Sequence, residues 1–421
     1  MLCQLVTFIS GLIVPRLILS TFGSEANGLV SSITQFLNYI ALVEGGIGSV
    51  VLTALYGPLA KKDDRKISSV LKAAENFFRQ IASIFVFYTI ALACVYPIVI
   101  KSSFSWLYVA SLTVILSLTL FIQYFFSIKL NDIHLLQADQ KMYIVQLWHA
   151  LITLLNIIAV VASVKIFPEL HFVKLCSVML FVIQPVAYSN YVKKHYKLYK
   201  DVESDKDSLA QRWACFGQNF AYFIHSNTDV VVLTLFSDLK AVSVYSVYLL
   251  VVKNLQSFFK AFSNAFNPMI GKAIAVNDYK QANKYMKTYE FVVSNIATII
   301  FGCCIYLLPS FVLIYTHGVT DTNYYRVFFS TIIILAEYIY CIREPYESVV
   351  YAAGKFKETS NSAYIEAIIN IVLSVILVFK YGLEGIAVGT FIGMLYRMIY
   401  WIWFINKYIM PYPISNIVKR L

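Results

Sequence analysis

The feature that most restricts the fold of this chain is a series of apolar stretches, each roughly 17–30 residues long, along its whole length. A helix of that length crosses the hydrocarbon layer of a membrane, which is roughly 30 Å thick. Hydrophobic residues make up 59% of the sequence and charged residues only 14%, whereas soluble domains carry about 25% charged residues. The sequence therefore predicts an integral membrane protein with many spans. It excludes a soluble enzyme, a nucleic-acid-binding module and a disordered chain.

We predict about 12 transmembrane helices from these stretches. Their bounds are 4–21, 26–56, 77–100, 104–128, 143–166, 170–192, 213–236, 242–270, 290–316, 324–352, 363–381 and 384–408. Basic loops alternate with short loops that carry few cations, with about 24 Lys and Arg on one side and about 6 on the other. Because basic loops stay in the cytoplasm, we expect both termini to be cytoplasmic. The net charge of +11 then reflects loops beside membrane lipids, and we expect no nucleic-acid partner.

An internal repeat relates the two halves of the sequence at a shift of about 214 residues. LLNIIAVV at 154–161 aligns with IINIVLSV at 368–375, which places Asn156 over Asn370. Each half holds about six spans, an even number, so both halves enter the membrane from the same side. The repeats are therefore expected to be parallel.

The repeat predicts an all-α integral membrane protein in which two parallel six-helix lobes surround a central cavity. We place the N-terminal lobe at 1–200, a cytoplasmic linker at 201–212 and the C-terminal lobe at 213–421. This arrangement is typical of transporters, whose sites lie between the halves near the middle of the membrane. A channel could be built in the same way, but the sequence contains no selectivity-filter pattern.

A polar, cationic stripe runs along the predicted span 242–270. With 100° per residue, the side chains on this stripe are Lys253, Gln256, Ser257, Lys260, Ser263, Asn264 and Asn267, and Phe258, Phe262 and Phe266 lie opposite. Charge inside a span is expensive and marks function, so we predict that the stripe lines a water-filled cavity. The alternatives are an interfacial helix on the cytoplasmic surface and a stripe buried against neighbouring helices.

Arg16 is a second cation inside a predicted span. The N-terminal apolar run begins almost at Met1 and has no small-residue cleavage site, so we interpret it as the first span and not as a signal peptide. Arg16 lies near the outer end of that span beside Pro15, where it either faces a cavity or extends its charge to the interface.

Three further groups are candidates for coupling or gating. His225 and Asp229 are four residues apart and share a helix face, where they form either a proton-linked pair or a structural hydrogen bond. Glu44 lies mid-span beside glycines that indicate close helix packing or a bend.

Other charges and the cysteines are given simpler interpretations. We interpret Glu337 and Arg397 as isolated charges within spans. We interpret Arg343 and Glu344 as surface groups at the cytoplasmic boundary. The seven cysteines lack metal-ligand spacing and are interpreted as buried small hydrophobes. We expect no metal site and no cofactor. The sequence has no phosphate-binding loop, nucleophile elbow or zinc-protease motif, so we do not expect an enzyme.

The stretch PRLILSTFGSEANGLVSSITQFLNYIALVEGGIGSVVLTALYGPLAKKD at 15–63 resembles the start of Wzx-type polysaccharide repeat-unit flippases. NTDVVVLTLF (227–236), YTHGVTDTNYYRV (315–327), REPYESVVYAAGKFKET (343–359) and NIVLSV…YGLEGIAVGT (370–390) look similar to later blocks of that family, in the same order. The family is part of the multidrug/oligosaccharidyl-lipid/polysaccharide exporter superfamily, and the similarity extends over essentially the whole chain.

The resemblance implies a protein of the bacterial cytoplasmic membrane that moves an undecaprenyl-diphosphate-linked oligosaccharide from the inner to the outer leaflet by alternating access. Such flippases carry cations in the first and eighth spans, and Arg16, Lys253 and Lys260 fall at comparable places. The expected cavity residues for the diphosphate are Arg16, Lys253, Lys260, Gln256, Asn264 and Asn267. A coupling ion, H⁺ or Na⁺, and the polysaccharide polymerase machinery are expected partners.

Three other functions remain open. An ion-coupled multidrug exporter of the same superfamily shares the fold, although a site for cationic drugs should favour carboxylates over lysines. A membrane glycan polymerase or ligase needs a sizeable external loop, which the sequence lacks. A structural partner of the glycan machinery would retain its activity after neutralisation of the cavity.

Overall fold

The computed structural model of the protein describes residues 2–44, 47–100, 102–125, 128–199, 201–205 and 216–409. Within these ranges the chain forms 14 helices and no strand, which confirms the predicted all-α class. Contacts divide the chain into two compact units, Met1–Phe220 (unit 1) and Ala221–Leu421 (unit 2), each with its own packed helices.

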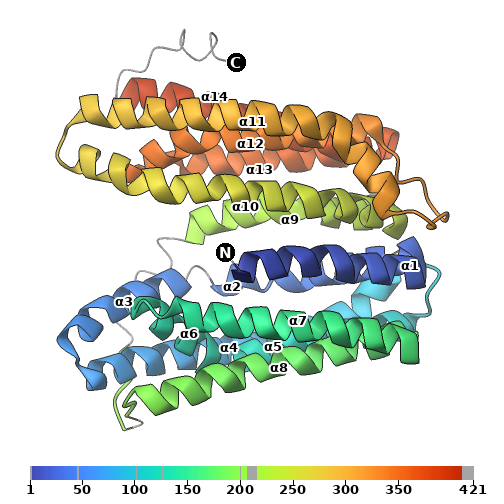
Figure 1. Ribbon diagram of the computed structural model, residues 1–421, viewed down its shortest axis with the longest axis horizontal. Coiled ribbons are helices and arrows are strands. Elements are labelled where there is room, and N and C mark those ends of the chain that lie inside the picture. Colours follow the sequence, from blue (N-terminus) through green and yellow to red (C-terminus); the bar gives the residue numbers. More distant parts are fainter. Residues whose placement is uncertain are drawn as a thin grey trace. The chain divides into compact units, whose positions relative to one another are not determined.

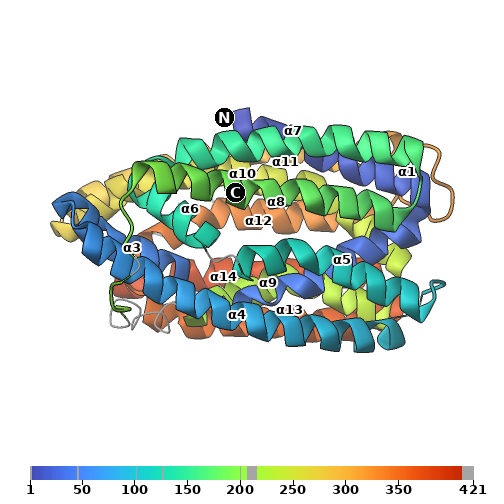
Figure 2. The same ribbon diagram turned by 90° about the horizontal axis from the view of Figure 1, so that it is seen from below.

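Unit 1 holds the helices drawn in blue to green in Figure 1. They are α1 (Leu2–Asn38), α2 (Ala41–Glu44), α3 (Ile47–Lys61), α4 (Asp64–Val99), α5 (Trp106–Phe125), α6 (Ile128–Ala138), α7 (Met142–Ile166) and α8 (Leu170–His195). Helix α7 packs against both α1 and α8, and α4 packs along α5 (Figure 2).

Unit 2 repeats the same succession of long helices. They are α9 (Phe216–Phe236), α10 (Leu239–Ala275), α11 (Tyr279–Tyr315), α12 (Val327–Ala352), α13 (Phe356–Tyr381) and α14 (Leu383–Tyr408). Helix α13 begins at Phe356 and its counterpart α7 at Met142, a separation of 214 residues that matches the shift found in the sequence. Helix α14 packs on both α12 and α13, and α10 packs on α11 and α12 (Figure 1).

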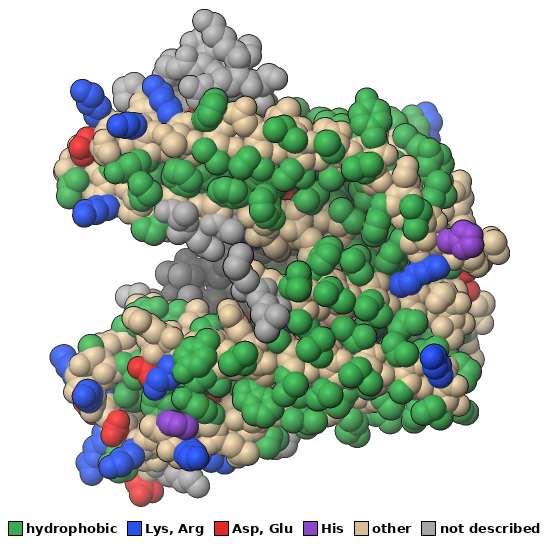
Figure 3. Space-filling view, viewed as in Figure 1, with side chains coloured by type: hydrophobic (Ala, Val, Ile, Leu, Met, Phe, Trp, Pro, Cys, Tyr) green, Lys and Arg blue, Asp and Glu red, His purple; other side chains and the backbone are tan. Residues whose placement is uncertain are grey.

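The helices have the length and composition of membrane spans. Among the described residues, 8 helical segments are long and apolar enough to cross a membrane, and α3, α5 and α9 contribute shorter apolar segments. The sides of the helices in each unit show mostly hydrophobic side chains, and Lys and Arg gather near the helix ends (Figure 3). The protein is therefore a multi-pass membrane protein.

Two helices begin earlier than the apolar pattern predicts. Helix α4 starts at Asp64 and α11 at Tyr279, more than ten residues before the predicted spans 77–100 and 290–316. Each is capped by an aspartate: Asp63 accepts from the backbone N of Lys66 at 3.0 Å, and Asp278 caps α11 in the same way. The polar first turns extend these helices beyond their apolar parts, where hydropathy alone gives no signal.

The second predicted span is interrupted. Residues 26–56 are not one helix, since α1 ends at Asn38 and a short turn separates it from α2. The two helical parts of α1 meet at Gly23, whose φ of 81° is a conformation that favours glycine. The predicted close packing near Glu44 is found at Gly48, where an added Cβ would lie 2.9 Å from the imidazole of His134.

In unit 2, helices α13 and α14 pack closely along a row of glycines. Gly385, Gly389 and Gly393 lie one turn apart on α14 and face α13. A Cβ at Gly385 would lie 2.5 Å from the carbonyl oxygen of Leu377, and one at Gly389 would lie 2.9 Å from the backbone N of Ser374. The missing side chains let the two backbones approach closely, as small residues do between membrane helices.

The segment after α8 packs on unit 1. Ser69 Oγ donates to the carbonyl oxygen of Glu203 at 2.5 Å, Lys72 Nζ donates to that of Val202 at 2.9 Å, and Lys66 pairs with Asp205 at 2.6 Å. The predicted linker at 201–212 continues into residues 206–215, which lie outside the described ranges, so the lobe boundaries stay a prediction. Of the cysteines, Cys215 lies outside these ranges and the others are free.

Candidate functional site

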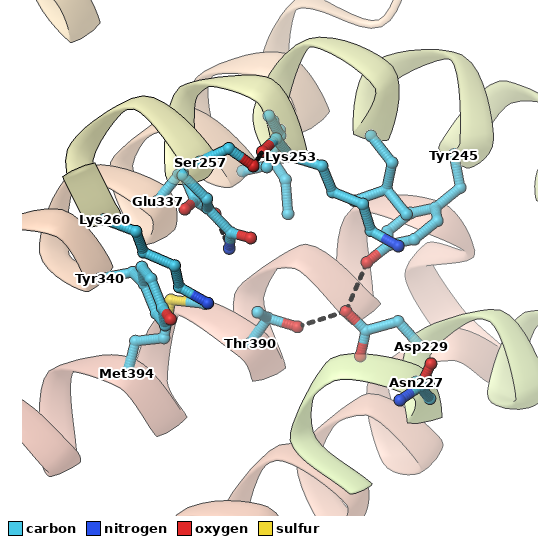
Figure 4. A pocket seen from close by; sticks show the side chains of 14 residues that line it. Asn227, Asp229, Tyr245, Lys253, Ser257, Lys260, Glu337, Tyr340, Thr390 and Met394 are labelled. Atoms are coloured by element: carbon cyan, nitrogen blue, oxygen red, sulfur yellow. Dashed lines mark hydrogen bonds between the residues drawn. The ribbon is translucent and has the colours of Figure 1, made fainter. Parts of the chain in front are cut away.

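Unit 2 encloses a cavity of about 300 Å³ among four of its helices. Residues of α9, α10, α12 and α14 form its wall (Figure 4). They are Asn227, Asp229, Tyr245, Leu249, Val252, Lys253, Gln256, Ser257, Lys260, Ile333, Glu337, Tyr340, Thr390 and Met394. Two ammonium groups and two carboxylates therefore share one cavity inside a membrane-spanning unit.

The polar stripe predicted on the eighth span contributes four of these residues. Lys253, Gln256, Ser257 and Lys260 all line the cavity from α10, as the helical spacing predicts. Two further members of the predicted site are not among the lining residues: the side chain of Asn264 lies outside the described part of the structure, and Asn267 is exposed.

Asp229 is the centre of a buried hydrogen-bond network at one end of the cavity. The hydroxyl of Tyr245 donates to Asp229 Oδ2 at 2.7 Å, and Thr390 Oγ1 lies 2.9 Å from the same oxygen. Asn370 Nδ2 donates to Thr390 Oγ1 at 2.9 Å, and Asn370 is fully buried on α13. The predicted pairing of Asp229 with His225 stays a prediction, because the His225 side chain lies outside the described part of the structure.

Two more oxygen atoms lie near this network. Asn370 Oδ1 and the hydroxyl of Ser374, one turn apart on α13, are both buried and have no hydrogen-bond partner among the described residues. A buried oxygen without a partner costs roughly 1–3 kcal/mol. The site thus gathers carboxylate, amide and hydroxyl oxygens, the ligand set that hard cations prefer.

Glu337 enters the cavity from α12. It is 2% exposed, and its Oε2 accepts a hydrogen bond from Gln256 Nε2 at 3.0 Å. The sequence marked Glu337 only as an isolated charge within a span, whereas the structure brings it next to the polar stripe of α10 (Figure 4).

The interpretation of Arg343 and Glu344 as surface groups is wrong, and so is that of Arg397 as an isolated charge. Arg343 and Glu344 are buried, with 6% and 8% exposure. Arg343 Nη1 pairs with Glu366 Oε1 on α13 at 2.7 Å, and Arg397 Nε lies 3.6 Å from Glu366 Oε2. The carboxylate of Glu366 pairs with both arginines and that of Glu347 also attracts both, which makes their burial tolerable.

The remaining predicted residues belong to unit 1. Arg16 is half-buried on α1, and its predicted role beside Lys253 and Lys260 stays a prediction. Glu44 is half-buried on α2 and accepts a hydrogen bond from the hydroxyl of Tyr124 on α5. This contact ties the broken second span to α5, and the coupling role of Glu44 is untested.

Sequence reasoning missed four residues of the site: Tyr245, Tyr340, Asn370 and Thr390. Tyr245 lies eight residues before Lys253, about 80° away on the α10 wheel, so the stripe could have been extended to include it. Asn370 was visible only as a member of the repeat. Tyr340 and Thr390 stand in apolar surroundings on their own helices and carry no local signal.

Comparisons with known proteins agree with the architecture. The MatE family model matches residues 214–376. No curated protein matches the chain. A solved structure of the lipid II flippase MurJ in an inward closed conformation has a TM-score of 0.73 and 17% identity, covering 100% of this chain and 89% of that chain.

Two multidrug transporter structures are also similar. An inward-facing MATE family transporter of the MOP superfamily has a TM-score of 0.69 and 13% identity, covering 94% of this chain and 93% of that chain. The eukaryotic MATE transporter AtDTX14 has a TM-score of 0.67 and 10% identity, covering 100% of this chain and 95% of that chain. The chain therefore has the fold of these membrane transporters.

Proposed function

We propose that this protein is a flippase that moves undecaprenyl-diphosphate-linked oligosaccharide repeat units from the inner to the outer leaflet of the bacterial cytoplasmic membrane. The observation that carries the proposal is the pair of lysines, Lys253 and Lys260, on the cavity wall of α10 inside a membrane-spanning unit. Charged side chains within a membrane-spanning unit mark function by default, and these two ammonium groups offer an anionic ligand two positive charges.

The chemistry of the substrate fits this cavity. A diphosphate and its sugars cannot cross about 30 Å of hydrocarbon without losing their hydration. Charge-assisted hydrogen bonds from Lys253 and Lys260, with the amide of Gln256 and the hydroxyl of Ser257, replace water around the phosphates. Arg16 is proposed to join them, and the polyprenyl tail stays in the lipid. Rocking of the two lobes then exposes the headgroup to each side in turn.

We further propose that Asp229 couples transport to a cation gradient. Tyr245 and Thr390 hold the Asp229 carboxylate, and the oxygen atoms of Asn370 and Ser374 stand close by on α13. This set suits either Na⁺ or a proton carried by the carboxylate. Asp229→Asn is expected to abolish the dependence of transport on the gradient, and an unchanged dependence would remove Asp229 from the coupling role.

The test of the function uses cells that lack this gene and keep the glycosyltransferases. A membrane-impermeant glycosidase applied to intact spheroplasts reports which leaflet holds the lipid-linked repeat unit. We expect the unit to accumulate and to stay protected until lysis. If it is already exposed outside but remains unpolymerised, the protein acts after translocation and the proposal fails.

Matched variants tie the same assay to the cavity. Wild-type protein should restore exposure of the repeat unit, and Lys260→Ala should not. Lys272→Ala is the control, because Lys272 lies on the same helix but is exposed and outside the cavity wall. Normal transport by Lys260→Ala, with normal insertion, contradicts the assignment of the cavity.

A multidrug exporter is the second candidate, and a specific observation favours it. Asp229 and Glu337 place two carboxylates in the same cavity as the lysines, and carboxylates suit cationic drugs. Solved structures of both kinds of transporter share the fold. Altered drug susceptibility after deletion, with normal export of the repeat unit, would support this second function.

A further inference from the structure

A chain of contacts that the proposed function does not yet use leads from the cavity wall into the helices behind it. It runs from Lys260 on α10 through Tyr340 and Arg343 on α12 to Glu366 on α13. Lys260 Nζ lies 5.9 Å from the centre of the Tyr340 ring, and Arg343 Cζ lies 4.7 Å from the same centre. Arg343 is paired with Glu366 at 2.7 Å.

The Lys260 side chain needs such a restraint. A lysine has about 2 kcal/mol of rotamer entropy to lose when it is fixed on a ligand. Lys253 and Lys260 lie two turns apart, about 10.5 Å along the helix, so their ammonium groups meet one diphosphate only if both side chains are directed toward it. In Figure 4 the Lys260 ammonium lies beside the Tyr340 ring, while that of Lys253 points toward Tyr245 and Asp229.

Tyr340 can supply that restraint only because the charge of Arg343 is neutralised. Cations within about 6 Å of an aromatic ring are attracted to its face. Two cations on one ring repel each other, and the carboxylate of Glu366 offsets the repulsion by pairing with Arg343. Tyr340 is 5% exposed and Arg343 is 6% exposed, so both side chains are buried within unit 2.

We propose that Tyr340 is a positioning residue that holds the Lys260 ammonium at the cavity wall, with Arg343 and Glu366 fixing the ring from behind. The role rests on the proposed function, since it assumes that Lys260 binds the diphosphate. The proposal assigns the effect to the aromatic ring, which both cations approach.

The experiment measures binding of undecaprenyl diphosphate to the purified full chain in detergent, together with the KM and maximal rate of lipid-linked oligosaccharide transport in proteoliposomes. Tyr340→Phe keeps the ring and should bind within two-fold of wild type. Tyr340→Leu removes the ring and should weaken binding by roughly three- to thirty-fold, the range of a cation–π contact. Its KM should rise by a similar factor, and its maximal rate should change little.

A double-mutant cycle separates positioning from ordinary packing. In a Lys260→Ala background, Tyr340→Leu should produce no further loss of binding. A loss that adds fully to that of Lys260→Ala overturns the inference, as does equal damage by Tyr340→Phe or wild-type binding by Tyr340→Leu. Should Tyr340→Leu not fold, Tyr340→Met fills similar space without an aromatic face and takes its place.

The same data distinguish failure of the proposed function from failure of the positioning role of Tyr340. Wild-type binding by Lys260→Ala removes the cavity from the proposed function and the role of Tyr340 with it. Loss of binding by Lys260→Ala, with no effect of Tyr340→Leu, leaves the function intact and refutes only the positioning role.

Discussion

Units 1 and 2 share one succession of helices but differ in the hydrogen bonds of their buried polar side chains. In unit 2, Asn370 on α13 joins a network with Thr390 and Asp229. Asn156, its repeat counterpart on α7, is also buried, but at the same shift Ser374 is replaced by Val160. The repeat therefore preserves the helices and one amide, and among the described residues the network around Asp229 is found in unit 2.

The paired helices also approach each other by different means. Helix α14 carries three glycines against α13, whereas α8, the counterpart of α14, contains no glycine. The polar contacts described between α7 and α8 join neutral groups: Gln184 Nε2 lies 3.1 Å from His149 Nδ1, and the Tyr188 hydroxyl donates to the carbonyl oxygen of Val145 at 3.2 Å. Between α13 and α14 a contact is ionic, with Glu366 Oε2 3.6 Å from Arg397 Nε on α14, and Glu366 also pairs with Arg343 on α12 at 2.7 Å. Close backbone contact and paired charges accompany the cavity in unit 2.

The largest effect is expected from breaking the ionic contact of unit 2. Glu366→Gln removes the carboxylate that pairs with both buried arginines, Arg343 and Arg397, which should lower stability by about 3–5 kcal/mol. Gln184→Leu removes the neutral contact of unit 1 and should cost about 1 kcal/mol. Thermal unfolding of the two purified variants in detergent measures both losses of stability. Equal costs would show that the ionic and neutral contacts contribute alike.

A smaller effect is expected from filling the close contact between α13 and α14. Gly389→Ala places a Cβ 2.9 Å from the backbone N of Ser374, so the helices must separate, at a cost of about 1–3 kcal/mol. The control is Gly302→Ala on α11, where nothing lies within 4 Å of the added Cβ. Thermal unfolding should separate the two variants, and the dependence of transport on the coupling cation should weaken only in Gly389→Ala. Identical behaviour would refute the packing argument.

The smallest effect concerns a buried carboxylate of unit 1 that lacks an arginine. Asp132 on α6, outside the predicted spans, is 3% exposed, and its Oδ2 has no hydrogen-bond partner among the described residues. Burial raises its pKa from 3.8 to about 7; the positive charge of Lys193 acts against the shift and the negative charge of Glu75 adds to it. The folded protein therefore holds a proton that the unfolded chain releases near pH 4.

The sign of the pH dependence follows from that raised pKa. The stability contribution of protonated Asp132 is fully present below about pH 4 and is lost as the pH rises toward about 7. Asp132→Asn cannot ionise, so its melting temperature relative to wild type should increase by a few degrees between pH 5 and pH 8. Melting curves at several pH values test this, and a difference that does not vary with pH would contradict it.

Local patterns in the sequence account for most of the helices and for the four residues of the polar stripe on the cavity wall. Hydropathy and length give the spans, because each helix in a membrane must satisfy its own backbone hydrogen bonds. The 100° rotation per residue gives the face of α10 that carries Lys253, Gln256 and Lys260. The repeat gives the match between α7 and α13 before any contact is known. All of these properties are local or periodic.

Contacts between distant segments were decided only by the tertiary structure. Asp229 on α9 meets Thr390 on α14, 161 residues away. The glycines of α14 let that helix approach α13, where Asn370 bonds to Thr390. Arg343 looked like a surface group because it lies near the cytoplasmic end of its predicted span, and its partner Glu366 stands on the next helix, 23 residues away. A hydropathy pattern indicates which parts of a helix face lipid. The partner of a buried charge depends on which helices pack together and at what distance.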